Sequence, residues 1–466
     1  MRSQWGSKIG FILASAGSTI GLGAVWKFPF ETSKNGGGAF LLIYLGICLT
    51  LGLVLMSTEI ALGRKTQLNP YGAFKKLGGK GWSLIGLVGI LVCFMIISFY
   101  SVIGGWTSAY FVSTLTGATH TTDGAISLNN FNTYVASPIS PVMYHLFFAC
   151  ATAATILFGV QKGIEKVSKY LMPILLILLF ILIIRSNTLP GSEEGLKQFL
   201  DFDFSKVTRE TWISALGLSF FSLSLAMGIM ITYGSYVDDK SSIIPSTVWI
   251  IVLTLTTCVL SGLMVLPAIT ALNLPANPGT GITFVTMPSV FASMPAGQLF
   301  GGLFFASLFV AALTSSISLL EVIVSSLIDQ FKMKRITAVV ISLVGFFSLG
   351  VLCSLSMGAT DQLKILNLSL FDFLDVVTGQ YLMPIGELFL ALFVAWKVWP
   401  LIEEQLVANS PKLKSLMLPF RIFLGVVVPV IIILIFDIKG KMTLLVNAVC
   451  GTESVTGFCG VMQSLI

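Results

Sequence analysis

Long apolar runs dominate the chain, and polar residues gather in the short stretches between them. A run of about 20 apolar residues is long enough to cross a bilayer as an α-helix. By that criterion the sequence predicts about eleven membrane-spanning helices. The predicted spans cover residues 9–30, 39–62, 82–115, 141–159, 167–186, 212–237, 243–273, 298–329, 336–357, 371–399 and 416–438. We therefore expect an all-α integral membrane protein that sits in a lipid bilayer as one domain, residues 1–440, followed by a tail, 441–466.

Composition and motifs narrow the function class. Hydrophobic residues make up 55% of the chain and charged residues 10%, whereas soluble proteins carry about 25% charged residues. The formal net charge of +6 is explained by its distribution over loops, so nucleic acid is not an expected partner. The chain has no nucleotide-binding loop, nucleophile elbow or Cys/His metal spacing, and we do not expect an enzyme.

Lysine and arginine concentrate in alternate loops. The positive loops lie within 64–80, 162–169, 332–335 and 397–414. The stretches 116–140 and 274–297 carry no Lys or Arg, and cytoplasmic loops are the positive ones. With Arg2 and Lys8 on the positive side, the N-terminus is predicted to be cytoplasmic and, for an odd number of spans in the cell membrane, the C-terminus extracytoplasmic. The stretch 187–211 mixes both signs of charge and is interpreted as a solvated loop.

Small residues interrupt the first and sixth predicted spans, at 16–24 and 221–228. Spans one and six are five apart, as expected for inverted repeats at about 9–186 and 212–399, with 416–438 as an extra span. Unwound backbone at mid-membrane depth is tolerated where it lines a cavity, and its helix ends offer dipoles to an ion and a solute. The competing explanation is that Gly and Ser allow close helix packing. The pairing of the two interruptions favours a binding site.

Several short motifs carry a resemblance to a known family. In order they are Gly21-Leu22-Gly23, Phe28-Pro29-Phe30, 35–40, Glu59-Ile60-Ala61-Leu62-Gly63-Arg64, 162–166, 231–236 and 313–317. They resemble the neurotransmitter:sodium symporter family, above all prokaryotic members similar to the bacterial leucine transporter. The resemblance implies a 5+5 inverted repeat with broken helices 1 and 6, and sodium-coupled import of a neutral amino acid or amino-acid-like solute by alternating access. A solute sensor without net flux is the alternative.

The resemblance also implies a sodium site, called here the Thr314 site. Its ligands would be oxygens of Gly17, Ile20, Ala311, Thr314 and Ser315. A hard cation prefers oxygen ligands, and neutral hydroxyls cost less to bury than carboxylates. The competing explanation for Thr314 and Ser315 is hydrogen bonding to their own helix.

The solute pocket is implied in the same way. Its backbone contacts would come from Thr19, Leu22, Gly23, Phe221, Ser222 and Ser224, with Tyr100 at the solute carboxylate. The side-chain contacts would come from Ile96, Phe221, Met227, Ser315 and Leu319. For Ile96, Met227 and Leu319, simple packing is an equal explanation. The set suggests a neutral, fairly apolar amino acid without naming it.

Charged residues within or beside the spans are assigned to gates and to a brace. Lys27 and Asp375 match an outer gate above Tyr100 and Phe221, and Asp372 is the competing partner of Lys27. The inner gate is matched by Arg2, Trp5 and Asp329. Glu59, an acid inside the second span, is expected to brace the unwound segments, with a proton relay as the less favoured role.

The chain departs from the family pattern at a second sodium site, called here the Thr254 position. Ala24 replaces an Asn, Thr254 aligns with an Asn or Asp, and Leu218 replaces a Gln. Thr19, Ser222 and Thr254 are the remaining side-chain oxygens, so we predict coupling to one Na⁺. Cys258 stands near the position tied to chloride, and chloride dependence is left open.

Overall fold

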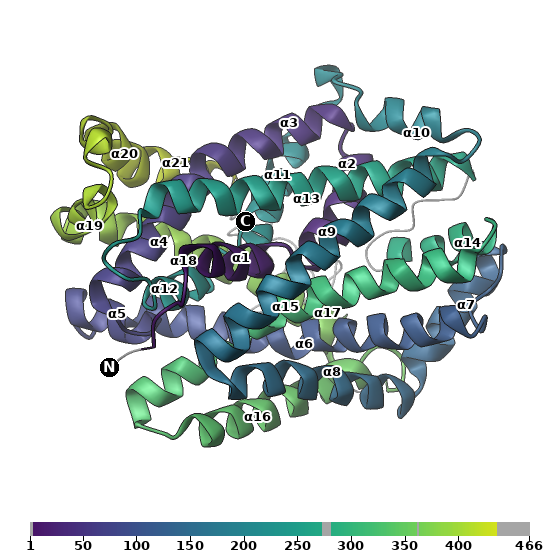
Figure 1. Ribbon diagram of the computed structural model, residues 1–466, viewed down its shortest axis with the longest axis horizontal. Helices are drawn as coiled ribbons and strands as arrows, with labels where there is room; N and C mark the ends of the chain where they lie inside the picture. The colour runs from purple at the N-terminus through teal and green to yellow at the C-terminus, as the bar shows by residue number, and fades with distance from the viewer. Residues whose placement is uncertain (1–2, 273–280, 361–362, 436–466) are drawn as a thin grey trace, which may run out of the picture.

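The computed structural model describes residues 3–272, 281–360 and 363–435, and its long helices run side by side along the horizontal of Figure 1. Within these residues, nine helical segments are long and apolar enough to cross a membrane. They are Gly38–Thr66, Ser83–Leu115, Ser140–Leu157, Val160–Asn187, Ile243–Ala271, Gly297–Phe331, Arg335–Leu355, Leu370–Val407 and Pro411–Leu434. Lys8–Thr19 and Gly23–Lys34 form a further span bent by 54°. The all-α membrane fold is confirmed, whereas the exact number of spans and the domain limits stay predictions.

The elements of the first half follow the predicted order. They are α1 (Lys8–Thr19), η1 (Gly23–Lys27), α2 (Phe28–Lys34), α3 (Gly38–Ile47), η2 (Cys48–Gly52), α4 (Leu53–Thr66), α5 (Pro70–Gly78), α6 (Ser83–Leu115), α7 (Gly124–Ala136), α8 (Ser140–Leu157), η3 (Val160–Glu165), α9 (Lys166–Asn187) and α10 (Ser192–Phe199). Here η1, η2 and η3 are wider π-helical turns within otherwise α-helical spans.

The second half repeats the pattern of long helices joined by short elements. Its elements are η4 (Phe204–Lys206), α11 (Arg209–Ser222), α12 (Ile229–Gly234), α13 (Ile243–Ala271), η5 (Ile282–Thr286), α14 (Met287–Ala292), α15 (Gly297–Phe331), α16 (Arg335–Leu355), β1 (Lys364–Ile365), β2 (Leu368–Ser369), α17 (Leu370–Val376), η6 (Val377–Leu382), α18 (Met383–Phe393), η7 (Val394–Val398), α19 (Trp399–Val407), η8 (Pro411–Leu416), α20 (Met417–Ile422), η9 (Phe423–Val427) and α21 (Val428–Ile435). Strands β1 and β2 form an antiparallel hairpin. The predicted tail 441–466 lies outside the described residues.

Both predicted interruptions are breaks in the helices. Helix α1 ends at Thr19, and Ile20 leaves helical geometry with φ −90° and ψ 63°. The sixth span is divided into α11 and α12, and between them Ser224 and Ala226 adopt φ of 54° and 62°. Such left-handed backbone is uncommon for residues other than glycine and is found where surrounding contacts hold it, often at functional sites.

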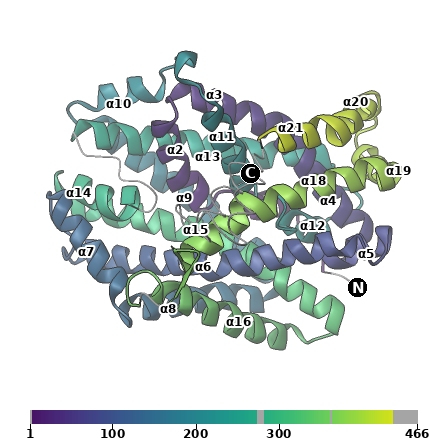
Figure 2. The ribbon, with the colours of Figure 1, turned by 180° about the vertical axis from the view of Figure 1, so that it is seen from behind.

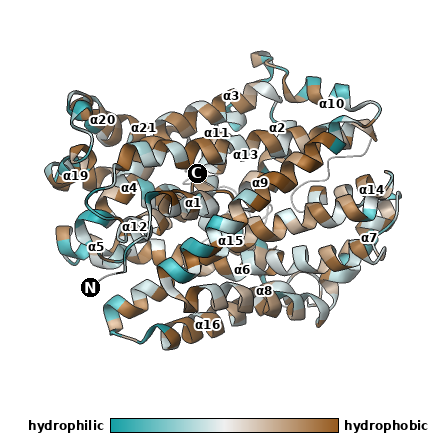
Figure 3. Cartoon of the chain, viewed as in Figure 1, coloured by the Kyte–Doolittle hydropathy of each residue, from teal (hydrophilic) through white to brown (hydrophobic). Residues whose placement is uncertain are grey.

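Burial separates a central helix from a lipid-facing shell. The apolar window of α15 is 83% buried, whereas the windows of Val160–Asn187 and Arg335–Leu355 are 28% and 33% buried. Helix α1 lies in the middle of the bundle and packs on α9, α13 and α15. Figure 3 shows hydrophobic residues along the length of α9 and α13, and hydrophilic residues near α5 at one end. This is the distribution that a bilayer requires.

Short helices lie at the ends of the bundle. Seen from either side, α7, α10 and α14 lie at the end opposite to the N-terminus and α5 (Figures 1 and 2). The interpretation of 187–211 as a solvated loop is therefore incomplete, because it contains α10. Gly195 and Phe199 of α10 are buried, and α10 packs on α13. The helix was not predicted because its apolar face is only two turns long and most of its other residues are charged or polar.

Candidate functional site

A small cavity lies between the two helix breaks and α15. It is lined by Ser18, Thr19, Gly21, Gly23, Ile96, Tyr100, Phe221, Ser222, Ser224, Met227, Ile229, Ser315, Ser318 and Leu319. Its volume of about 20 Å³ is roughly the space of one water molecule. Every side chain or backbone segment predicted for the solute pocket lines it except Leu22, which lines the adjoining cavity on the Lys27 side. The sequence thus located the cavity, while the solute contacts themselves stay predictions.

Tyr100 closes one side of the cavity against the first break. Its hydroxyl accepts a hydrogen bond from the Leu22 amide at 3.0 Å. A Cβ on Gly21 would lie 2.4 Å from Ser315 Oγ and 2.7 Å from the Tyr100 hydroxyl. Only glycine at position 21 therefore allows the first span to approach both side chains. The backbone groups at a helix break lack regular helical partners and can bind a charged group of a solute.

The Thr314 site lies where α1 ends against α15. Ser315 Oγ donates to the Ser18 carbonyl at 2.8 Å and lies 3.3 Å from the Gly17 carbonyl. Thr314 Oγ1 lies 3.1 Å from the carbonyls of Val310 and Ala311, so the bonding to its own helix is present. A hydroxyl that donates its proton keeps lone pairs for a cation.

The remaining donors of the Thr314 site are backbone carbonyls. Ile20 follows the last residue of α1, and a carbonyl at a helix end lacks a regular helical partner. Together with the two hydroxyls, the donor set is neutral oxygen, which fits a sodium ion.

The Thr254 position is satisfied by contacts within the protein. Thr19 Oγ1 and Thr254 Oγ1 lie 2.5 Å apart, and Thr254 Oγ1 also donates to the Ile250 carbonyl at 2.9 Å. Ser222 Oγ lies 2.6 Å from the Tyr44 hydroxyl. The three oxygens that the sequence leaves for a second sodium ion already have hydrogen-bond partners.

The polar groups around Cys258 also have hydrogen-bond partners within the protein. Its sulfur lies 3.5 Å from the Tyr44 hydroxyl. Ser261 Oγ donates to the Ala24 carbonyl at 2.6 Å.

Two buried carboxylates meet the second break. The Ala226 amide lies 2.9 Å from Glu59 Oε1 and 2.6 Å from Glu387 Oε1. Glu59 also accepts hydrogen bonds from the Met230 and Ile231 amides in the first turn of α12. This geometry supports the predicted bracing role of Glu59. The sequence analysis missed Glu387, although a carboxylate inside the span 371–399 is the same signal that identified Glu59.

The predicted outer gate lines a hollow above the solute cavity. Lys27 and Asp375 both line two cavities of about 250 and 120 Å³. Within the described part of the chain no ion pair joins them, and Lys27 Nζ lies 5.3 Å from the centre of the Phe221 ring. Asp372 instead bonds Ser369, the N-cap of α17: its amide donates to Ser369 Oγ at 3.0 Å, and its carboxylate accepts from that hydroxyl at 2.6 Å. Of the two predicted partners, Asp375 is thus the one that shares cavities with Lys27, and Glu31 lines the same two cavities.

The opposite side is packed around Trp5. Its backbone amide donates to the Tyr236 carbonyl and its indole to the Tyr233 carbonyl, both at 3.0 Å. Asp329 accepts from the amide and side chain of Asn69 at 2.9 and 3.0 Å. Arg2, the third predicted member of the inner gate, lies outside the described residues. An ion pair between the buried Glu321 and the partly exposed Arg335, at 2.5 Å, adds a contact on this side that the sequence analysis did not single out.

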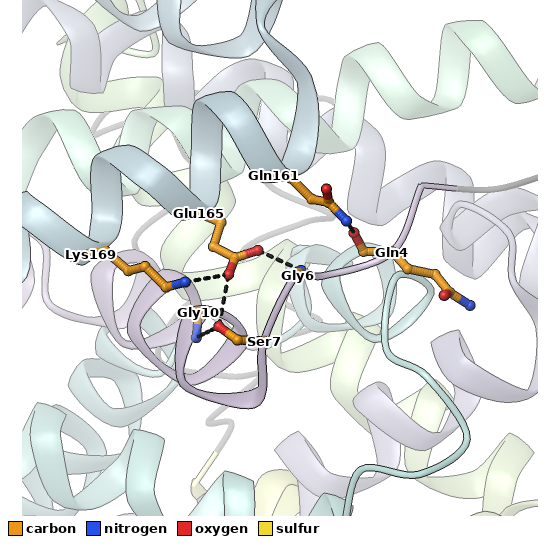
Figure 4. A network of polar contacts seen from close by, with 7 residues as sticks. All are labelled: Gln4, Gly6, Ser7, Gly10, Gln161, Glu165 and Lys169. Carbon is orange, nitrogen blue, oxygen red and sulfur yellow. Dashed lines mark hydrogen bonds and ion pairs between the residues drawn. The ribbon is translucent and has the colours of Figure 1, made fainter.

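A polar network joins the N-terminal segment to the start of the fifth span (Figure 4). Glu165 Oε2 accepts from the Gly6 amide at 2.7 Å, and Oε1 accepts from Ser7 Oγ at 2.8 Å and Lys169 Nζ at 2.7 Å. Ser7 in turn caps α1 by accepting from the Gly10 amide. A Cβ on Gly10 would lie 2.1 Å from Glu165 Oε1. The lysine-rich motif 162–166 therefore contributes a carboxylate that holds the entry of the first span.

The comparisons with known proteins agree with this geometry. The model of the family described as "Sodium:neurotransmitter symporter family" matches residues 2–134 and 135–439. The chain belongs to the sodium:neurotransmitter symporter family. The predicted resemblance is confirmed, and with it sodium as the coupling ion and a transporter rather than an enzyme.

Relatives of this family align along almost the whole chain. An uncharacterized sodium-dependent transporter of Bacillus subtilis is 37% identical over 438 residues, covering 93% of this chain and 96% of the relative. One of Haemophilus influenzae is 33% identical, covering 93% and 97%. The crystal structure of MhsT in complex with L-phenylalanine is similar with a TM-score of 0.86 and 35% identity, covering 94% of this chain and 99% of MhsT. The broken-helix symporter fold is thus shown.

The structure also adds pocket residues that the sequence analysis did not name. Ser18 and Ser318 line the cavity beside the predicted residues. Ser318 lies three residues after Ser315, so both project from one face of α15. That spacing was a usable signal, but a serine in an apolar helix has no distinctive pattern of its own.

Proposed function

We propose that this symporter imports a neutral amino acid, or an amino-acid-like solute, together with one sodium ion by alternating access. The solute would bind in the cavity between the two breaks, and the ion at the Thr314 site. The relative MhsT, which is seen in complex with L-phenylalanine, supports an amino acid as the solute. Lys27 and Asp375 would close the cavity on one side, and Trp5 and Asp329 on the other.

One observation carries the choice of a single sodium ion. At the Thr254 position, Thr19 and Thr254 lie 2.5 Å apart and bond each other, and Ala24 provides no side-chain oxygen. An ion there would have to break this hydrogen bond and would find fewer polar ligands than usual. Each missing ligand in a dry site costs about 1–3 kcal/mol, or roughly tenfold to a hundredfold in affinity.

Stoichiometry tests this proposal directly. In proteoliposomes that transport the solute, the reversal potential gives the number of sodium ions per solute, and we expect one, with a sodium Hill coefficient near one. Ala24→Asn combined with Thr254→Asn should raise the sodium dependence, whereas the matched variant Thr254→Val should keep the Hill coefficient near one. Two sodium ions per solute in the unaltered protein would refute the single-ion assignment.

We also propose that the N-terminus is cytoplasmic. The arrangement supports this, because the N-terminus and α5 lie at one end of the bundle and α7, α10 and α14 at the other (Figure 1), as the alternation of positive loops predicts. An N-terminal protease site should be cut only after the membrane of intact cells is opened, and cleavage in intact cells would reverse the orientation.

A further inference from the structure

A wide hollow lies beside the polar network that joins the N-terminal segment to the fifth span. Its volume is about 510 Å³, which is within the range of about 300–1,000 Å³ that ligand sites in proteins occupy. Four of its lining residues are labelled in Figure 4. The full lining is Gly6, Gln161, Lys162, Glu165, Lys166, Lys169 and Tyr170. We call it the lysine hollow, because three of these residues are lysines and only one is an acid.

The single acid of the lysine hollow does not balance all three lysines. Both oxygens of Glu165 are already used, since they accept from the Gly6 amide, Ser7 Oγ and Lys169 Nζ. Lys162 and Lys166 are exposed, and neither forms an ion pair or a hydrogen bond with another residue that the structure describes. The hollow therefore holds two lysine charges in excess of those that the protein neutralises.

An exposed apolar stripe begins at the edge of the lysine hollow and follows α9. The span Val160–Asn187 that contains α9 is 28% buried, the lowest value among the nine long spans of the described residues. Tyr170 lies four residues after Lys166, and its side chain begins the stripe. Its members are Tyr170, Ile174, Ile177, Ile181 and Ile184, which are between 39% and 65% exposed. Their spacing of three and four residues places them on one face of the helix.

This combination of charge and apolar surface fits one class of ligand. A phosphate group matches the ammonium groups of lysines, and an acyl chain matches an apolar stripe that lies within the bilayer. A phospholipid carries both groups at the spacing at which the hollow and the stripe adjoin. The general preference for lysine on the cytoplasmic side explains the sign of the charge. It does not explain why the lysines converge on one hollow at the end of an exposed stripe.

We propose that the lysine hollow binds the headgroup of an anionic phospholipid. Lys162 and Lys166 contact its phosphate, and the acyl chains lie along the stripe of α9. Basic pockets between transmembrane helices bind anionic headgroups in this way. The inference goes beyond the proposed function, because it depends neither on the identity of the solute nor on the number of sodium ions.

Phosphatidylglycerol and phosphatidylcholine with the same acyl chains form the decisive pair of probes. The first has a net negative headgroup, whereas the second carries its own positive charge beside the phosphate. Each lipid is titrated into the purified full chain in a neutral detergent, at a fixed salt concentration of about 0.15 M because salt screens exposed charges. The rise in melting temperature measures binding. Each lysine near an anionic headgroup raises affinity roughly fivefold, so we expect phosphatidylglycerol to bind at least about tenfold tighter.

Lys162→Gln combined with Lys166→Gln tests whether the hollow is responsible. Both side chains are exposed, so the variant should fold, and it should narrow the ratio of the two affinities to about twofold or less. Lys412→Gln combined with Lys414→Gln is the matched control. It removes two exposed lysines between α19 and α20, at the same end of the bundle as the N-terminus but outside the hollow (Figure 1). The control should keep the ratio of the unaltered protein.

The same titration with soluble glycerol phosphate separates a lipid from a free anion. This probe has the phosphate but no acyl chains, and we expect it to stabilise the protein far less than phosphatidylglycerol at equal concentration. Equal stabilisation would overturn the assignment to a lipid.

Three other results would also overturn the inference. They are equal binding of the two lipids, a ratio that survives the loss of Lys162 and Lys166, and a ratio that falls equally in the control, which would indicate general attraction between charges. None of these measurements involves the solute, so a negative result leaves the proposed function standing.

Discussion

Replacing Glu165 with Gln should release the N-terminal segment from the start of the fifth span. The Glu165 side chain is 4% exposed, and three donors converge on it (Figure 4). Gln keeps the shape of the side chain but offers one acceptor oxygen instead of two. When that oxygen faces Ser7 and Lys169, the amide nitrogen faces the Gly6 N–H, and two donors then oppose each other.

The size of the effect follows from these contacts. A hydrogen bond to a charged group contributes about 1.5–3 kcal/mol. The ion pair with Lys169 adds only ~0–1 kcal/mol, because the Lys169 side chain is 40% exposed. We expect the free energy that holds the N-terminal segment against the fifth span to fall by about 2 kcal/mol. This is equivalent to a roughly 30-fold rise in the population in which the segment is detached.

Hydrogen exchange of the full chain measures that population, because amide exchange reports local opening. Amides within 6–10 should exchange about 30-fold faster in Glu165→Gln, while those of α16 keep their rates. Lys169→Gln is the matched control. It removes the exposed ion pair and leaves the carboxylate, so it should change exchange by no more than about fivefold. An equal effect of both variants would mean that charge, and not the hydrogen bonds to Gly6 and Ser7, holds the segment.

Two further predictions concern the ion and the outer gate. Thr314→Val combined with Ser315→Ala removes two oxygen ligands at nearly constant volume and should weaken sodium affinity at least about tenfold while the protein folds. Thermal stabilisation by sodium measures this affinity. An unchanged affinity would rule out the Thr314 site. Lys27 and Asp375 line one cavity without forming an ion pair, and we expect them to pair when that side of the protein closes. A variant with both charges exchanged should therefore retain more uptake than either variant with a single charge reversed. Equal defects in the single and double variants would argue against the pair.

Much of this architecture could be predicted because a helix that crosses a membrane requires a run of about 20 apolar residues, which is easily recognised in a sequence. Apolar length located the long helices to within a few residues, as for α6 and α8. The breaks were visible because Gly and Ser cluster where backbone must leave the helix. Helix α10 was not predicted, since its apolar face is short and its charges are those of a loop. A long apolar run has one explanation, whereas a short amphipathic helix depends on a partner that the sequence does not identify.

Some residues of the candidate site could likewise be predicted from the sequence, and others could not. Thr314 and Ser315 could be placed because the motif 313–317 carries them, and Tyr100 because the family resemblance implied its role. Glu59 could be placed because an acid within a span is a functional hypothesis by default. Ser318 and Ser18 could not be singled out, since a buried serine can satisfy its hydroxyl by bonding to its own helix. Their contact with each other joins two segments far apart in the sequence, which is a property of the folded chain.

The buried oxygens of the Thr254 position have hydrogen-bond partners within the protein. A hydroxyl buried without a partner costs about 1–3 kcal/mol, so these oxygens need such contacts. Here Thr19 and Thr254 supply them to each other at 2.5 Å, and the Ala24 carbonyl accepts from Ser261. At the Thr314 site the hydroxyls donate to backbone carbonyls and keep their lone pairs, so the oxygens still suit a cation. The hydroxyls of the Thr254 position also donate to backbone carbonyls, so the proposal of one sodium ion rests on Ala24, which provides no side-chain oxygen, and on the hydrogen bond between Thr19 and Thr254 that an ion would have to break.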